Sequence, residues 1–130
     1  MYLIDTNVWL ELLLKQDKYI DVQQLFEKIE ASYLAISEFS IYSIGIILTK
    51  LKKDDVFKDF ISDTIEDSGV VVARLSVSDL KEIISIRQKY KLDFDDAYQY
   101  VAAQKYNYIL ISYDKDFDYT EKGRITPDKI

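Results

Sequence analysis

Apolar residues are arranged along this chain in two alternating patterns: short continuous runs, and longer stretches with about one apolar position per helical turn. The short runs are rich in Ile, Val and Leu and have the length of buried strands. They cover Tyr2–Ile4, Tyr33–Ile36, Val70–Ala73 and Tyr108–Ile111, with a weaker run near Ile125, before Pro127. The pattern therefore predicts about five short strands.

The longer stretches between these runs have helical spacing. From Glu38 to about Lys52, the residues Ile41, Ile44 and Leu48 recur about one turn apart, and Ser37 is a suitable N-cap. The expected helices are Val8–Leu14 after a cap at Thr6 or Asn7, Ile20–Glu30, Glu38–Lys52, Val56–Ile65, a helix from Ser78 that buries Leu80, Ile83 and Ile84, and Phe94–Lys105.

Short strands separated by helices are typical of a parallel sheet with helices on both faces. We therefore expect an α/β fold, specifically a three-layer α/β/α sandwich with a mostly parallel central sheet. Only three glycines and one proline occur, so no linker is evident and residues 1–130 are interpreted as a single domain. In such folds ligands bind beyond the carboxyl ends of the strands, which is where we look for a site.

Composition excludes whole classes of chemistry. The chain has no Cys and no His, which removes thiolate zinc sites, cysteine nucleophiles, Ser-His-Asp triads and imidazole metal sites. Any catalysis must use carboxylates, hydroxyls, lysines or metal ions. The net charge of −6 counts against a stable complex with long nucleic acid, for which basic residues supply affinity. It counts less against an enzyme that meets one phosphate at a time.

The N-terminal segment is apolar, but it contains Asp5 and Glu11 and does not start with basic residues. It is typical of neither a signal peptide nor a membrane span. A cytoplasmic protein is therefore expected.

Four acidic residues stand out because of their position relative to the predicted strands. Asp5 ends the first strand, Glu38 follows the second, Asp114 follows the strand near residue 110, and Asp96 joins them if its helix starts beside the same edge. Parallel strands bring their carboxyl ends to one edge. Clustered carboxylates repel and burial raises the cost, so a divalent cation is the simplest means of stabilising them. Mg²⁺ and Mn²⁺ favour such oxygen ligands and would activate water and neutralise a leaving oxygen.

Each of these residues also has a purely structural interpretation. Asp5 and Glu38 would stabilise the N-terminal turns of helices. Asp93 would cap a helix whose first turn Asp96 stabilises, so Asp93 remains an alternative to Asp96. After the strand near residue 110, the possible ligands or turn residues are Asp114, Asp116 and Asp118, of which Asp114 lies closest to the strand end.

Taken in order, four motifs resemble the PIN domain family. Leu3-Ile4-Asp5-Thr6-Asn7 is similar to its start, where a strand ends in Asp followed by Thr or Ser. Three further motifs resemble the second, third and fourth acidic sites of the family: Ile36-Ser37-Glu38, Leu92-Asp93-Phe94-Asp95-Asp96-Ala97 and Ile111-Ser112-Tyr113-Asp114-Lys115-Asp116-Phe117. The likeness extends from Leu3 to about Pro127.

The resemblance implies an Mg²⁺- or Mn²⁺-dependent ribonuclease on a five-stranded parallel sheet. Carried over position by position, Asp5, Asp96 and Asp114 would be the metal ligands, and Glu38 would complete the cluster as a ligand or by orienting the attacking water. PIN proteins of this length look most like VapC-type toxins, which implies RNA as substrate and an antitoxin as partner. The family also includes RNA-processing and regulatory members, so a nuclease outside a toxin system is an alternative.

Other functional classes fit the sequence less well. Haloacid-dehalogenase phosphatases have Asp-x-Asp after the first strand, whereas this chain has Asp5-Thr6-Asn7. Receiver domains need a lysine that faces the acidic pocket, and no strand here clearly ends in one. A non-catalytic PIN-fold binding module remains an alternative, although unused clustered carboxylates would reduce stability.

The helix that begins at Glu38 is apolar over more than one face, at Ile41, Ile44, Ile46 and Ile47. This surface fits a homodimer seam or a groove for a partner peptide, and a fully enclosed helix would explain it equally well.

Overall fold

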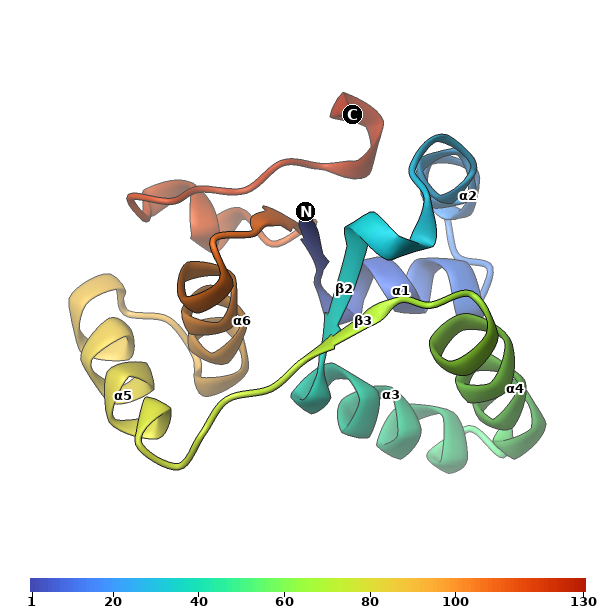
Figure 1. The fold of residues 1–130 in the computed structure, drawn as a ribbon, viewed down its shortest axis with the longest axis horizontal. Helices are drawn as coiled ribbons and strands as arrows, with labels where there is room; N and C mark the ends of the chain where they lie inside the picture. Colours follow the sequence, from blue (N-terminus) through green and yellow to red (C-terminus); the bar gives the residue numbers. More distant parts are fainter.

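The computed structural model describes the whole chain, Met1–Ile130. At its centre is a four-stranded sheet in the order β3-β2-β1-β4, with every pairing parallel (Figure 1). The strands are β1 (Tyr2–Ile4), β2 (Leu34–Ser37), β3 (Val71–Ala73) and β4 (Ile109–Ile111). The predicted α/β class and parallel sheet are therefore confirmed.

The weak strand expected near Ile125 is reduced to a single bridge. Ile125 pairs in parallel with Ile111 of β4, and its N–H donates to the carbonyl of Leu110 at 2.9 Å. The pairing does not extend further because Pro127 has no N–H to continue a ladder and instead opens a short 3-10 turn, η4 (Pro127–Lys129). The sheet thus has four strands and one additional bridged residue.

Helices fill the connections between the strands. The α-helices are α1 (Thr6–Leu13), α2 (Tyr19–Lys28), α3 (Glu38–Lys50), α4 (Asp54–Asp59), α5 (Asp79–Tyr90) and α6 (Phe94–Tyr106). Two further 3-10 turns are η1 (Ala31–Tyr33) and η3 (Lys115–Tyr119), and η2 (Phe60–Asp67) is a π-helical segment. No helix combines the length and the apolar character that crossing a membrane requires.

Successive side chains of the strands point to opposite faces of the sheet, as pleating requires. Leu3 and Leu110 pack with α5 and α6, whereas Ile4, Ile36 and Ile111 pack with α1, α2, α3 and η2. All five side chains are buried. Figure 1 shows the resulting three layers, with α5 and α6 on one side of the sheet and α1 to α4 on the other.

Several helices begin or end one or two residues from the predicted boundaries, and one predicted helix is divided. The segment expected as one helix over Val56–Ile65 is α4 continued by the π-helical η2, which buries Phe60. Helix α3 ends at Lys50 rather than Lys52, and Leu51, which follows it, is exposed.

The apolar face of α5 also differs from the prediction. Ile83 and Ile86 are buried, whereas Leu80 and Ile84 are exposed. Helical spacing alone does not determine which stripe faces the core when apolar residues occur on two sides of a helix. Here α6 covers the Ile83–Ile86 side.

Candidate active site

A cavity of about 300 Å³ lies where the ends of β1 and β4, the first turns of α6 and one side of α3 meet. Four of its lining residues are Asp, and none is Lys or Arg. The lining residues are Asp5, Thr6, Asn7, Leu10, Phe39, Ser43, Ile47, Asp95, Asp96, Gln99 and Asp114. The cavity is therefore acidic and lies at the edge of the sheet where the sequence predicted a site.

Asp5 follows the end of β1 and caps α1. Its carboxylate accepts hydrogen bonds of 2.7 Å from the Thr6 N–H and from the Ser112 hydroxyl. The side chain is buried, and burial raises its pKa to about 6 although both hydrogen bonds act in the opposite direction. The N-cap of α1 is thus Asp5 rather than the expected Thr6 or Asn7. Asp5 both caps the helix and lines the cavity.

Ser112 and Asn7 connect the residues that follow β1 to those that follow β4. The buried Ser112 hydroxyl donates to Asp5 and accepts the N–H of Asp114 at 2.9 Å. The Asn7 side-chain oxygen accepts the N–H of Tyr113 at 3.2 Å. Two short connections thus fix the position of Asp114 relative to Asp5.

Asp96 is the most strongly perturbed carboxyl group of the cavity. It sits in the first turn of α6 and is nearly buried. Burial raises the pKa of Asp96 to about 8, with contributions from the hydrogen bond and charge of Asp114 and from the charges of Asp95 and Asp5. Without a cation, Asp96 therefore favours its protonated form near neutral pH.

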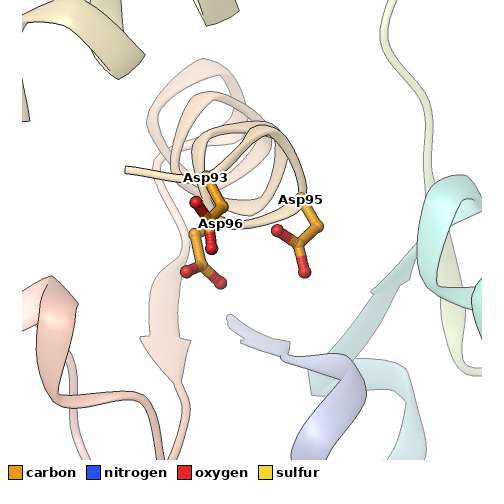
Figure 2. A group of neighbouring side chains, drawn as sticks. All are labelled: Asp93, Asp95 and Asp96. Atoms are coloured by element: carbon orange, nitrogen blue, oxygen red, sulfur yellow. The ribbon is translucent and has the colours of Figure 1, made fainter. Parts of the chain in front are cut away.

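Asp96 belongs to two groups of carboxylates whose oxygen atoms lie within 4.8 Å of one another. One group contains Asp114 and Asp116, and the other contains Asp93 and Asp95. Figure 2 shows the second group projecting to the same side of the first turn of α6. The alternatives Asp93 and Asp116 thus lie beside Asp96 and Asp114 rather than in a separate place. Asp5 is in neither group, but it lines the same cavity.

A chain of uncharged polar side chains forms another part of the site. Ser37 caps α3 by accepting the N–H of Ser40, and its hydroxyl donates to the Ser40 hydroxyl oxygen at 3.1 Å. The Ser40 and Thr6 hydroxyls are 2.7 Å apart, and the Gln99 amide nitrogen donates to both oxygens. The Gln99 carbonyl oxygen is buried and has no partner.

Glu38 is the first residue of α3, but it does not line the cavity. Its carboxylate accepts a hydrogen bond of 2.7 Å from Nε of Arg74, which follows β3. Helix α3 presents Phe39, Ser43 and Ile47 to the cavity instead. The structure thus brings Asp5, Asp96 and Asp114 into one cavity and leaves Glu38 outside it.

Three polar residues of the lining were not identified from the sequence. Asp95 was visible as an acidic neighbour of Asp96, and its position in the first turn of a helix at the sheet edge is the signal that would have found it. Ser43 and Gln99 carry no such signal, because both are ordinary residues within helices.

The lining residues fit a hard divalent cation. The set supplies oxygen atoms only, from carboxylates, hydroxyls and amides, which is the donor set that Mg²⁺ and Mn²⁺ prefer. Burial raises the pKa values of Asp5 and Asp96, and no basic side chain lines the cavity to compensate their charge. The unpartnered oxygen of Gln99 is a further polar atom that the protein itself does not satisfy.

The family model described as PIN domain matches residues 2–123. The chain belongs to the PIN domain family. PIN domains are generally nucleases and typically use divalent metals. The family assignment and the sequence resemblance agree over nearly the whole chain. No curated protein sequence matches the chain.

Solved structures share this PIN fold over the full length. A toxin–antitoxin complex from Klebsiella pneumoniae contains a chain that is 25% identical, with a TM-score of 0.77 and 98% of each chain covered. FitAcB from Neisseria gonorrhoeae is 18% identical, with a TM-score of 0.78 and complete coverage of both chains. VapC20 from Mycobacterium tuberculosis, a toxin that cleaves the sarcin–ricin loop, is 15% identical, with a TM-score of 0.74 and coverage of 96% of this chain and 97% of its own.

Proposed function

We propose that this PIN protein is an Mg²⁺- or Mn²⁺-dependent endoribonuclease of the cytoplasm and the toxin of a toxin–antitoxin pair. The observation that carries the proposal is the convergence of Asp5, Asp96 and Asp114 from three separate segments into one cavity that no basic side chain lines. Buried carboxylates such as Asp5 and Asp96, whose pKa values burial raises, are costly in a protein that does not use them.

In this proposal Asp5, Asp96 and Asp114 hold the cation, with Asp93, Asp95 or Asp116 available beside them. When bound, the cation would lower the pKa of a water, position the scissile phosphate and neutralise charge on the leaving oxygen. Ser112 and Thr6 N–H hold the Asp5 carboxylate in a fixed orientation. Because the chain has no His, the carboxylates are the available acceptors for a proton of the attacking water.

RNA is the proposed substrate, and the cavity meets one phosphate of the RNA strand at a time. The acidic surface of the chain, with a net charge of −6, disfavours a long electrostatic contact with nucleic acid. This supports brief encounters in which the bound cation, rather than lysines, meets the phosphate. The sarcin–ricin loop specificity of VapC20 is a property of that protein, and the target of this chain is to be found by experiment.

The test is cleavage of an end-labelled single-stranded RNA, with a DNA of the same sequence, in Mn²⁺, Mg²⁺ or chelator. Wild type should cut RNA only with metal, and Asp96→Asn should lose activity. The matched control is Asp63→Asn, which makes the same chemical change at an exposed position of η2. Asp63 does not line the cavity. Equal cutting by wild type and Asp96→Asn would contradict the proposed site.

The toxin proposal is supported by the toxin–antitoxin complex among the similar structures. An antitoxin segment that inhibits this enzyme should place a basic side chain in the acidic cavity, because the lining supplies no positive charge. Induced expression of wild type should arrest bacterial growth, and Asp96→Asn should not. Co-expression of the product of a neighbouring small open reading frame should restore growth.

We also propose a homodimer, supported by exposed apolar side chains on two helices. Tyr42 and Ile46 on α3, and Leu80 and Ile84 on α5, are each separated by one helical turn and remain exposed. Light scattering should give twice the monomer mass for wild type, and Ile46→Glu should reduce it. A monomeric wild type at micromolar concentration would contradict this part of the proposal.

A further inference from the structure

Gln99 is a buried polar residue inside an acidic cavity. It lies three residues after Asp96 on α6, and therefore on the same face of that helix. Its side chain is 1% exposed, yet it belongs to the lining of the cavity. A glutamine in this position needs a hydrogen-bonding explanation, because buried amides are normally satisfied.

The nitrogen of the Gln99 amide is fully satisfied. It donates to the hydroxyl oxygens of Ser40 and Thr6, which accounts for its two protons. Ser40 is oriented in turn by Ser37, whose hydroxyl donates to it and leaves the Ser40 proton for Thr6. This hydroxyl chain fixes the amide with its nitrogen toward α3 and its carbonyl oxygen away from these partners.

The carbonyl oxygen Oε1 of Gln99 has no donor within the protein. The carboxylates that line the same cavity accept hydrogen bonds and do not donate them when ionised. When the carboxylates are ionised, as they are around a bound cation, the donor for this oxygen comes from a molecule inside the cavity. Water in the hydration shell of a divalent cation is such a donor, and Mg²⁺ keeps several waters when carboxylates bind it.

We propose that Gln99 is a positioning residue of the cation site, whose Oε1 accepts a hydrogen bond from a water of the hydrated cation held by Asp96 and its neighbours. The inference rests on the proposed metal-dependent function. Gln99 holds the hydrated cation in one orientation, and the Ser37–Ser40–Thr6 chain holds Gln99. Outer-shell partners of this kind typically contribute about 10–100-fold to metal affinity.

The first test is a calorimetric titration of Mn²⁺ into wild type, Gln99→Met and Gln99→Glu. Gln99→Met keeps the length of the side chain and removes the acceptor, so Mn²⁺ should bind about tenfold more weakly or worse. Gln99→Glu restores an acceptor oxygen at the same place and should bind Mn²⁺ at least as tightly as wild type. Gln104→Met makes the same chemical change at an exposed position of α6 and should bind like wild type.

Wild-type affinity in Gln99→Met would overturn the inference and leave the metal site intact. Loss of discrimination between RNA and DNA in that variant, with wild-type Mn²⁺ affinity, would assign the oxygen to a ribose hydroxyl and would also overturn the inference. If wild type does not bind Mn²⁺, the proposed function and this inference both fail.

A second measurement needs no variant and so does not depend on folding of Gln99→Met. The side-chain carbonyl carbon of Gln99 is followed by NMR while Mg²⁺ is added to labelled wild-type protein. Its resonance should shift in step with the carboxyl resonance of Asp96, whereas that of Gln104 should not move. An unmoved Gln99 resonance at saturating Mg²⁺ would also overturn the inference.

Discussion

The hydroxyl of Ser112 donates a hydrogen bond of 2.7 Å to the carboxylate of Asp5, across the ends of the neighbouring strands β4 and β1. The same hydroxyl accepts the N–H of Asp114. One buried oxygen therefore positions two of the three proposed ligands. We therefore expect Ser112 to contribute more to the geometry of the site than most side chains other than the carboxylates.

Ser112→Ala should reduce both stability and metal binding. The change removes one hydrogen bond from the buried Asp5 carboxylate, which keeps that from the Thr6 N–H, and it leaves the Asp114 N–H without its side-chain partner. This should lower the free energy of unfolding by about 1–3 kcal/mol. Urea unfolding in chelator measures this loss. Ser85→Ala, which removes a hydroxyl from the exposed side of α5, is the control and should change stability little. Equal stability of the two variants would show that the Ser112 hydrogen bonds contribute nothing net.

The stability of the metal-free protein should fall as the pH rises. Asp96 has a folded-state pKa of about 8 against an ordinary value of 3.8. Between these values the folded state holds a proton that the unfolded state releases, so stability is present at low pH and is lost as the pH rises through about 8. Asp5, with a pKa of about 6, acts in the same direction at lower pH.

Thermal melting in chelator from about pH 5 to about pH 8.5 tests this pH dependence. Asparagine cannot ionise, so the melting temperature of Asp96→Asn should depend less on pH in the upper part of this range. The variant should therefore be more stable than wild type near pH 8. Asp63→Asn, an exposed change in η2 outside the cavity, should keep the wild-type curve. A wild-type melting temperature that rises over this range would contradict the raised pKa of Asp96.

The fold could be predicted because each central strand is a short continuous run of apolar residues. Its length and its burial are both visible in the local sequence. The runs at Tyr2–Ile4 and Ile109–Ile111 are apolar and short, and both are central strands. The acids that follow parallel strands could be predicted for the same reason, since the sheet brings Asp5 and Asp114 to one edge.

The remaining parts of the site could not be read from spacing. Glu38 follows a strand as Asp5 does, but it begins α3 with its carboxylate on Arg74. The polar residue that α3 presents to the cavity is Ser43, more than one turn further along. Which side of a helix faces a cavity depends on how the helix packs, and α3 is apolar on more than one side. Gln99 is found only through the hydroxyls of Thr6 and Ser40, which are distant from it in the sequence.

Glu38→Gln should leave metal binding and RNA cleavage close to wild type. The pair with Arg74 is partly exposed, at 36% for the Glu38 side chain, so its loss should cost less than about 1 kcal/mol. Asp114→Asn, compared under the same conditions, should lose Mn²⁺ affinity and activity. The comparison uses Mn²⁺ titration and single-turnover cleavage. A loss in Glu38→Gln as large as that in Asp114→Asn would restore Glu38 to the cluster that the sequence resemblance implied.

Ser43→Glu should add a ligand to the site and so tighten Mn²⁺ binding. Ser43 of α3 lines the same cavity as the acidic residues of α6 and of the segment after β4. The affinity of oxygen-ligand sites for a cation rises with the number of charged ligands. In chelator the extra carboxylate should lower the melting temperature, because it joins a group of like charges without a counter-ion. Tyr42→Glu introduces the same residue one position earlier on the exposed side of α3 and should change neither property in this way.

Tighter Mn²⁺ binding together with a lower metal-free melting temperature, found in Ser43→Glu alone, would locate the cation in this cavity. Parallel behaviour of the two variants would indicate that the cation binds elsewhere.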